Sequence, residues 1–177
     1  TTIGIWAPVT LEIRNDLWIE DVIIVPSVRH KTLAIRATVS NLSGTDRDFT
    51  LTGRVTQSNT ALRQVPHLRG STPAGGSTTV NTTLPWDSPP LWWPHDPILL
   101  HLESSLQAGD RLLDQRRDRF GFREVWANGE HVVLNGTPLH LLGNSCHPLG
   151  YTRERAVEVY DQCRAAHINC FRLHAQP

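Results

Sequence analysis

Two cysteine–histidine pairs near the end of the chain have side chains that can bind a metal ion. Cys163 and His167 are four positions apart, and so are Cys170 and His174. Thiolates and imidazoles are ligands of structural zinc, but neither pair has the C-x-x-C or H-x-x-x-H spacing of a zinc finger. Side chains four positions apart on a strand are separated by about 13 Å, too far to share one ion. We therefore expect no metal and no other cofactor, and we interpret Cys163 and Cys170 as small core residues between a helix and a strand.

Three tryptophans in a proline-rich stretch offer a different chemistry, the stacking of sugar rings. Trp86, Trp92 and Trp93 lie between Pro85 and Pro97, and because prolines cannot occupy a central strand we expect an ordered loop here. A carbohydrate platform is one interpretation, since exposed aromatic faces can stack on sugars. The other is that the tryptophans close the end of a domain or a junction between domains, because large aromatic side chains are usually mostly buried.

The composition excludes several function classes. Seventeen Lys and Arg residues balance seventeen Asp and Glu residues, so we expect neither a nucleic-acid partner nor an anionic membrane surface. No apolar run approaches the ~18 residues of a spanning helix, and no sequence feature indicates a compartment. Three cysteines, all after residue 145, do not form a disulfide framework. The chain lacks methionine and starts in a predicted strand, so we expect it to be part of a longer polypeptide.

The elements that must position these residues begin with a series of short strands. Residues 31–40 give the clearest pattern, because apolar Leu33, Ile35, Ala37 and Val39 alternate with polar residues. Further strands are predicted at residues 9–14, from residue 18, and at 49–55, 60–66, 77–84, 97–106 and 110–119. Seven short strands with frequent turns within about 100 residues predict an immunoglobulin-like β-sandwich.

From residue 124 the pattern changes. Asn128-Gly129 and Asn135-Gly136 are hairpin-turn dipeptides on either side of a predicted strand at 131–134. Residues 139–143 predict a short buried strand, and residues 168–173 predict another. Between them Thr152 is a candidate helix N-cap, followed by residues that share one helical face: Ala156, Val159, Tyr160, Cys163 and Ala166. Strand, helix and strand in this order predict a βαβ unit and hence a parallel sheet.

An ordered series of short motifs resembles a known family. In chain order it comprises Gly4-Ile5-Trp6, Pro26, Leu91-Trp92-Trp93-Pro94, Phe120-Gly121-Phe122-Arg123, Leu134-Asn135-Gly136, Gly143 with His147, and Asn169 with Arg172. The set and its order, spread over almost the whole chain, are similar to glycoside hydrolase family 2, which includes β-galactosidases, β-glucuronidases and β-mannosidases.

The resemblance implies a domain plan. In that family a jelly-roll domain is followed by an immunoglobulin-like sandwich and then by a TIM barrel. Residues 1–15 would be the last strand of the jelly roll, residues 16–118 the sandwich, and residues 119–177 the truncated start of the barrel. The expected fold class is therefore mainly β, an immunoglobulin-like β-sandwich followed by an incomplete βαβ start of a TIM barrel.

The resemblance also implies a retaining glycosidase, whose chemistry needs two carboxyl groups about 5 Å apart. After residue 119 the carboxylates are Glu124, Glu130, Glu154, Glu158 and Asp161. None follows a predicted barrel strand, where TIM-barrel active sites are built. The family's two catalytic glutamates lie on later strands, so we expect no catalytic residue in this chain and no activity from it alone.

What the chain is expected to contribute is part of the substrate pocket. His147 follows the first predicted barrel strand, and Arg172 with His174 ends the second. By resemblance, His147 would bind sugar hydroxyls and Arg172 would hold the nucleophile carboxylate, with His174 beside them. The structural alternatives are that His147 is an ordinary surface-loop histidine and that Arg172 forms an ion pair inside the incomplete barrel.

Two hypotheses remain for the function. The first is a fragment of an exo-glycosidase that hydrolyses β-linked sugars, in which the sandwich supports the catalytic barrel. The second is a non-catalytic immunoglobulin-like module for carbohydrate binding or adhesion. Under the first hypothesis, the exposed strand edges of the incomplete barrel would favour association into a homo-oligomer.

Overall fold

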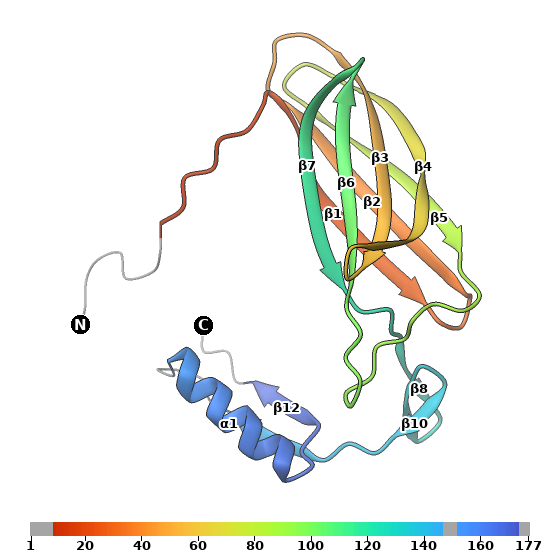
Figure 1. Cartoon of the computed structure of the whole chain (residues 1–177), viewed down its shortest axis with the longest axis vertical. Coiled ribbons are helices and arrows are strands. Elements are labelled where there is room, and N and C mark those ends of the chain that lie inside the picture. The colour runs from red at the N-terminus through yellow and green to blue at the C-terminus, as the bar shows by residue number, and fades with distance from the viewer. Residues whose placement is uncertain (1–8, 147–151, 174–177) are drawn as a thin grey trace.

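The main body of the molecule is a sandwich of two antiparallel sheets. The computed structural model describes residues 9–146 and 152–173. The first sheet has the order β1-β2-β5, with bounds Leu17–Ser27, Thr32–Asn41 and Ser77–Pro85. The second has the order β4-β3-β6-β7, with bounds Thr60–Thr72, Arg47–Gln57, Leu100–Ala108 and Arg111–Phe120. In Figure 1 the four-stranded sheet lies in front of the three-stranded sheet. The seven-stranded sandwich predicted from the sequence is confirmed.

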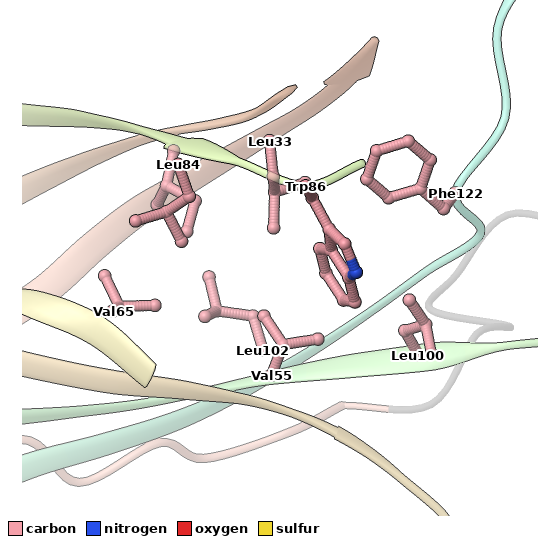
Figure 2. Close-up of a cluster of buried hydrophobic side chains, with 9 residues drawn as sticks. Leu33, Val55, Val65, Leu84, Trp86, Leu100, Leu102 and Phe122 are labelled. Atoms are coloured by element: carbon pink, nitrogen blue, oxygen red, sulfur yellow. The ribbon is translucent and has the colours of Figure 1, made fainter. Parts of the chain in front are cut away.

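The alternation of apolar residues along the strands builds the core between the sheets. Leu33, Ile35, Ala37 and Val39 of β2 are all buried, as their period of two predicts. They divide between two apolar clusters, one at each end of the sandwich. The cluster near the exit of β7 includes Trp86 and Phe122, which contribute side chains from outside the strands (Figure 2).

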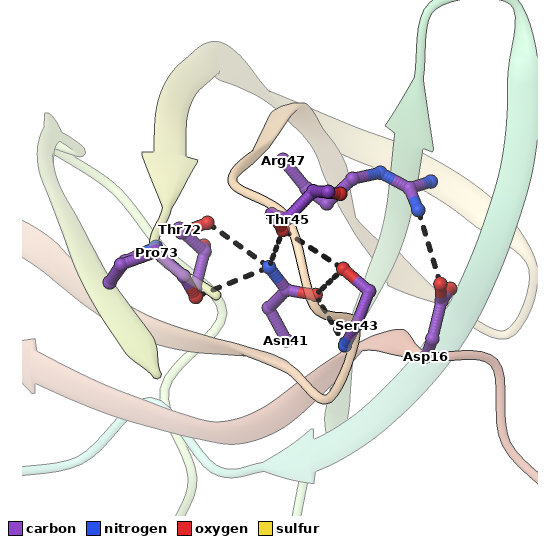
Figure 3. Close-up of polar contacts among 7 residues, drawn as sticks. All are labelled: Asp16, Asn41, Ser43, Thr45, Arg47, Thr72 and Pro73. Atoms are coloured by element: carbon purple, nitrogen blue, oxygen red, sulfur yellow. Dashed lines mark hydrogen bonds and ion pairs between the residues drawn. The ribbon is translucent and has the colours of Figure 1, made fainter. Parts of the chain in front are cut away.

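The opposite end of the sandwich is fixed by a buried asparagine at the end of β2. Asn41 is 1% exposed, and its Nδ2 donates to the carbonyl oxygens of Thr45, Thr72 and Pro73 (Figure 3). Its Oδ1 accepts hydrogen bonds from the backbone N–H and the hydroxyl of Ser43. Because both ends of the amide are satisfied, the hydrogen bonds offset the cost of burying this polar group, and the side chain holds two loops together.

The strand predicted at residues 9–14 is not formed. Residues 9–15 extend away from the sandwich (Figure 1), and Val9, Leu11 and Ile13 are 79%, 87% and 92% exposed. A strand needs a neighbour to satisfy its backbone, and within the described residues this segment has none. Its assignment to a preceding jelly-roll domain stays a prediction, and residues 1–8 lie outside the described residues.

After β7 the chain forms a small antiparallel meander. It consists of β8 (Val125–Asn128), β9 (His131–Leu134) and β10 (Thr137–Leu139). Asn135 and Gly136 connect the last two strands with φ of 52° and 90°, as a type I′ hairpin turn requires. The turn predicted from this dipeptide is therefore confirmed. At the first hairpin the loop is Gly129-Glu130, because Asn128 already pairs with His131.

The last described elements form the predicted βαβ unit. Strand β11 (Gly143–Cys146) pairs in parallel with β12 (Cys170–Leu173), and α1 (Arg153–Ala165) connects them. The Thr152 hydroxyl accepts a hydrogen bond from the Arg155 backbone N–H, which confirms the predicted N-cap. Whether these two strands start a TIM barrel stays a prediction.

The buried strand predicted at residues 139–143 is wrong in position. The strand begins at Gly143, and Leu141 and Leu142 are 44% and 43% exposed. The reason is Asn169, whose side-chain Oδ1 accepts from the Leu142 N–H and whose Nδ2 donates to the His140 carbonyl. These bonds hold the His140 carbonyl and the Leu142 N–H outside the sheet, so the apolar run does not become a strand.

Candidate functional site

The carboxyl edge of the parallel pair β11–β12 carries Arg172, the one predicted site residue that lies within the described residues. The register pairs Ser145 with Arg172 and Cys146 with Leu173, so the two strands end side by side. Arg172 is exposed at this edge. His147 directly follows Cys146 in the sequence and His174 directly follows Leu173, but both histidines lie outside the described residues. Polar residues after the carboxyl ends of parallel strands are the usual material of a binding site.

Helix α1 covers the parallel pair through two contacts. The rings of Tyr160 and Phe171 meet edge to face with centroids 5.2 Å apart. Cys163 is 8% exposed, and the Asn144 Nδ2 donates to its sulfur at 3.9 Å. Cys163 is thus a small core residue, as interpreted from the sequence.

No group of three or more His, Cys, Asp or Glu side chains within residues 9–146 and 152–173 is arranged to hold a metal ion. Because His174 lies outside those ranges, the zinc alternative is not tested. The same described part of the chain has no helix long and apolar enough to cross a membrane.

A second site lies where the sandwich gives way to the meander. The loop after β5 returns to the exit of β7: Leu91 bridges Phe122, and the Trp92 N–H donates to the Phe122 carbonyl at 3.0 Å. Gly121 faces the Trp92 ring so closely that a Cβ there would stand 2.9 Å from it. The Arg123 guanidinium lies over the same ring, 4.2 Å from its centroid. The Leu-Trp-Trp-Pro and Phe-Gly-Phe-Arg motifs are therefore two halves of one contact.

Asn135, from the third motif, joins this contact. Its Nδ2 donates to the Trp92 carbonyl at 2.9 Å, and its Oδ1 accepts from the Glu124 N–H at 2.9 Å. Its own backbone N–H donates to the Glu124 carbonyl, also at 2.9 Å. We call residues 91–93, 120–124 and Asn135 the junction. The hairpin turn of the meander is thereby attached to both the tryptophan loop and the exit of the sandwich.

Glu124 connects the junction to the turn between β1 and β2. Its carboxylate accepts hydrogen bonds from the Arg29 backbone N–H at 3.0 Å, the Arg29 Nε at 2.6 Å and the Ser27 hydroxyl at 3.1 Å. Partial burial alone would raise the pKa of this carboxyl, but the hydrogen bonds and the Arg29 charge outweigh burial and lower its pKa to about 2. Arg29 also lies over the Trp126 ring, 4.8 Å from its centroid, so one side chain contacts β8 and the strand exit together.

The low pKa of Glu124 predicts an acid-sensitive attachment. The ionised carboxylate stabilises the folded chain above its ordinary pKa of 4.5, and this stabilisation is lost as the pH falls from there toward 2. Because Arg29 is half exposed and solvent screens its charge, we expect Glu124→Gln to lower the free energy of unfolding by about 1–3 kcal/mol at pH 7. Urea unfolding of both proteins at a series of pH values measures the difference.

The two curves should converge near pH 2, where the wild-type carboxyl becomes protonated as well. Glu130→Gln is the matched control, because Glu130 is exposed in the β8–β9 turn and makes no ion pair with the described residues. A Glu124→Gln difference that is the same at pH 7 and pH 2 would contradict the assigned role.

The structure bears on only one of the two interpretations of the tryptophans, packing at the end of a domain. Trp86 is 4% exposed and meets Phe122 edge to face at 5.5 Å, so it packs in the core (Figure 2). Trp92 is half-buried between Gly121 and Arg123. Trp93 is half-buried and stacks on His95 with ring centroids 6.0 Å apart. Packing at a domain end thus accounts for Trp86 and Trp92.

The comparisons with known proteins agree with this geometry. The model of the family described as glycosyl hydrolases family 2 matches residues 17–123, which is the sandwich and its exit. The chain belongs to this family. A putative β-glucuronidase of Formosa agariphila is 35% identical over 63 residues, which cover 31% of this chain and 6% of that protein.

Solved structures of family 2 enzymes share the fold. A β-galacturonidase from Eisenbergiella tayi bound to galacturonate matches with a TM-score of 0.82 and 20% identity, over 93% of this chain and 30% of that one. A Bacteroides uniformis β-glucuronidase matches with a TM-score of 0.77 and 24% identity, over 93% of this chain and 22% of that one. The chain therefore spans less than a third of the length of these relatives.

In this family 2 chain all five carboxylates after residue 119 lie outside β11 and β12. Glu124 is bound by Arg29, and Glu130 is exposed in a turn. On α1, Glu158 pairs with Arg155, and Glu154 has its pKa lowered by a hydrogen bond from its own backbone N–H and one from the Thr152 hydroxyl. Asp161, also on α1, pairs with Arg164.

Sequence reasoning missed the roles of Glu124 and Asn135. The Asn135-Gly136 dipeptide predicted the turn but not the contacts of the Asn135 side chain. No local sequence pattern distinguished Glu124 from the other charged residues. The signal that was present is the order of the motifs: three short patterns separated by up to 43 positions proved to be one contact.

Proposed function

We propose that this chain is part of a retaining glycosidase that hydrolyses β-linked sugars, in which the sandwich supports a catalytic barrel that begins with β11 and β12. The observation that carries the proposal is the parallel register of these strands, which ends both at one edge beside Arg172. Membership of family 2 supports the reaction class. The printed names of the relatives suggest β-glucuronides, β-galacturonides and β-galactosides as the sugars to test.

In this proposal the edge residues bind substrate and hold the catalytic machinery. Arg172 extends from β12 at the edge and, as a permanent cation, would orient and stabilise the carboxylate of the nucleophile. His147 and His174 would contribute hydrogen bonds to sugar hydroxyls. Both catalytic glutamates would lie outside the 177 residues of this chain.

The chain alone is therefore expected to be inactive. Retaining hydrolysis needs two carboxyl groups about 5 Å apart at one site, and a sugar pocket needs convergent polar groups around an enclosed space. Here only one side of such a pocket is represented. We expect no turnover of nitrophenyl β-glycosides by the purified 177-residue chain, and at most millimolar affinity for monosaccharides.

The experiment compares this chain with the longer protein that contains it. Extending the reading frame past Pro177 should reveal an Asn-Glu pair at a strand end and a second strand-end Glu, and the longer protein should cleave at least one of the nitrophenyl β-glucuronide, β-galacturonide, β-galactoside or β-mannoside. A stop codon or a second sandwich after residue 177 would instead favour the binding or adhesion module. Turnover by the short chain would refute the placement of the catalytic groups.

A further inference from the structure

The outer face of the four-stranded sheet carries an open groove of about 720 Å³. Residues from all four strands line it, including Thr52 and Arg54 of β3, Gln64 of β4, Glu103 of β6, and Gln115 and Arg117 of β7. The antiparallel register places Arg54 opposite Glu103 and Glu103 opposite Arg117, so these three side chains share the outer face. We call this region the sheet groove.

Positive charge predominates on this face, although the chain as a whole has a formal net charge of zero. Arg69 pairs with Thr50, which precedes Thr52 by two positions on β3. Arg119 pairs with His101, which precedes Glu103 by two positions on β6. Side chains two positions apart on a strand share a face, so both arginines lie on the outer face. With Arg54 and Arg117 this gives a band of four arginines across the sheet. The carboxylates on the same face are Glu103 and Asp48, so two positive charges remain unbalanced. A locally basic surface on a neutral protein attracts anions selectively.

Glu103 organises the centre of the groove. The Arg54 Nε donates to its Oε2 at 2.8 Å, and the Arg117 Nε lies 3.7 Å from its Oε1. Both arginines remain about half exposed, at 57% and 50%, whereas Glu103 is 27% exposed. The hydrogen bond from Arg54 lowers the pKa of Glu103, so this carboxylate stays ionised and holds the two guanidinium groups in place. Each guanidinium still presents N–H donors to solvent, in the planar geometry that matches a second carboxylate.

The lining of the groove lacks the aromatic surface on which neutral sugars stack. No tryptophan, tyrosine or phenylalanine occurs among the described residues that line it, so it offers no stacking surface. Its neutral members are amides and hydroxyls, such as Gln64, Gln115 and Thr52, which can hydrogen-bond sugar hydroxyls. The groove is open along the sheet and is not enclosed. Such a surface suits a chain that bears repeated negative charges.

We propose that the sheet groove is a secondary binding site for a polyuronate, a polysaccharide that carries a carboxylate on each sugar. Arg54 and Arg117 bind successive carboxylates, Arg69 and Arg119 extend the contact along the chain, and the glutamines bind hydroxyls. The choice of a sugar polymer among polyanions rests on the proposed function, whereas the anionic requirement rests on the groove alone. A site of this kind would keep the polymer near the catalytic edge between cleavage events.

The outer face of the other sheet provides the contrast and the control. There Arg36 of β2 lies opposite Asn81 of β5 and Ile23 of β1, and Asp21 lies opposite the neighbouring Thr38. This face also carries the carboxylate of Glu20, which accepts a hydrogen bond from the Ser40 hydroxyl, so it has no excess of positive charge. Arg36 is exposed, so Arg36→Gln removes the same charge from the same fold without touching the groove.

The test is titration calorimetry of the intact 177-residue chain with oligogalacturonate and with its methyl ester, which keeps the sugar rings but removes the charges. We expect binding of the free acid that weakens with added salt and no binding of the ester. The double variant Arg54→Gln/Arg117→Gln should lower the affinity about tenfold or more, since it removes two charged hydrogen-bond donors. Arg36→Gln should bind as the wild type does.

Glu103→Gln separates loss of binding from loss of structure. Removing the competing carboxylate frees both guanidinium groups, so the affinity should rise about threefold or more, the opposite of what a misfolded variant would give. Equal binding of the ester, unchanged binding by the double variant, or equally tight binding of single-stranded DNA would overturn the proposal. Binding is measured without turnover, so a failure here leaves the proposed hydrolytic activity untouched, and an inactive longer protein leaves this result standing.

Discussion

Replacing Trp86 with alanine is expected to lower the free energy of unfolding of the sandwich by about 3–5 kcal/mol, which is the usual cost of emptying a large aromatic site. Trp86 is 4% exposed, contacts Phe122 edge to face, and has the Arg63 guanidinium 5.5 Å above its ring. Its backbone N–H also donates to the Lys31 carbonyl at 2.7 Å, so the β1–β2 turn and the core meet at this residue. Urea unfolding followed by circular dichroism measures the change.

The loss of stability in Trp86→Ala should come from the lost packing of the buried ring alone. Trp93→Ala is the matched control, because Trp93 lies in the same loop but is only half-buried, and its ring contact is with His95. We expect this variant to cost about 1 kcal/mol or less. Equal destabilisation by the two substitutions would show that the loop as a whole, rather than the core contact of Trp86, carries the stability.

Replacing Arg172 with alanine in the longer protein is expected to lower kcat about 100-fold, because a fixed cation that stabilises charge at the reacting centre contributes on this scale. The effect rests on the proposed function. Arg172 is exposed at the carboxyl edge of β12, so its removal should leave the unfolding midpoint of the protein almost unchanged. Steady-state kinetics with the preferred nitrophenyl β-glycoside provide the measurement.

Two further variants distinguish a positioning role for Arg172 from a purely structural one. Arg172→Lys keeps the charge but not the planar guanidinium, so it should recover part of the activity and shift the pH profile of kcat/KM. Arg164→Ala removes an arginine from α1 whose side chain is 82% exposed and pairs only with Asp161 within the described residues, and it should be fully active. Full activity of Arg172→Ala would remove this residue from the proposed site.

The sequence predicted those parts of the fold that depend on local pattern. The alternation at residues 31–40, the Asn135-Gly136 turn and the Thr152 cap each reflect a preference of a few neighbouring residues, and the structure has all three. The prediction failed where a side chain distant in the sequence determines the local structure. The apolar run at 139–143 reads as a strand, but Asn169 binds its backbone and moves the strand to Gly143.

The candidate site divides in the same way. That polar residues lie at the ends of the parallel strands was visible from the sequence, and the structure has Arg172 exposed on β12; its role in a site stays a prediction. The role of Glu124 was not visible, because its partners Ser27 and Arg29 lie 97 and 95 positions earlier. No spacing rule connects residues so far apart. Only the closure of the sandwich brings the β1–β2 turn beside the exit of β7.

The attachment of the meander to the sandwich has a practical consequence for anyone who exchanges catalytic domains between enzymes of this family. A cut at the end of β7 would separate Glu124 from Arg29 and Asn135 from Trp92, so both pieces would lose the hydrogen bonds that attach the meander to the sandwich. A cut after Leu139 keeps every one of these partners on the same side. For building chimeras, the transferable sandwich unit therefore ends at residue 139, some twenty residues beyond its last strand.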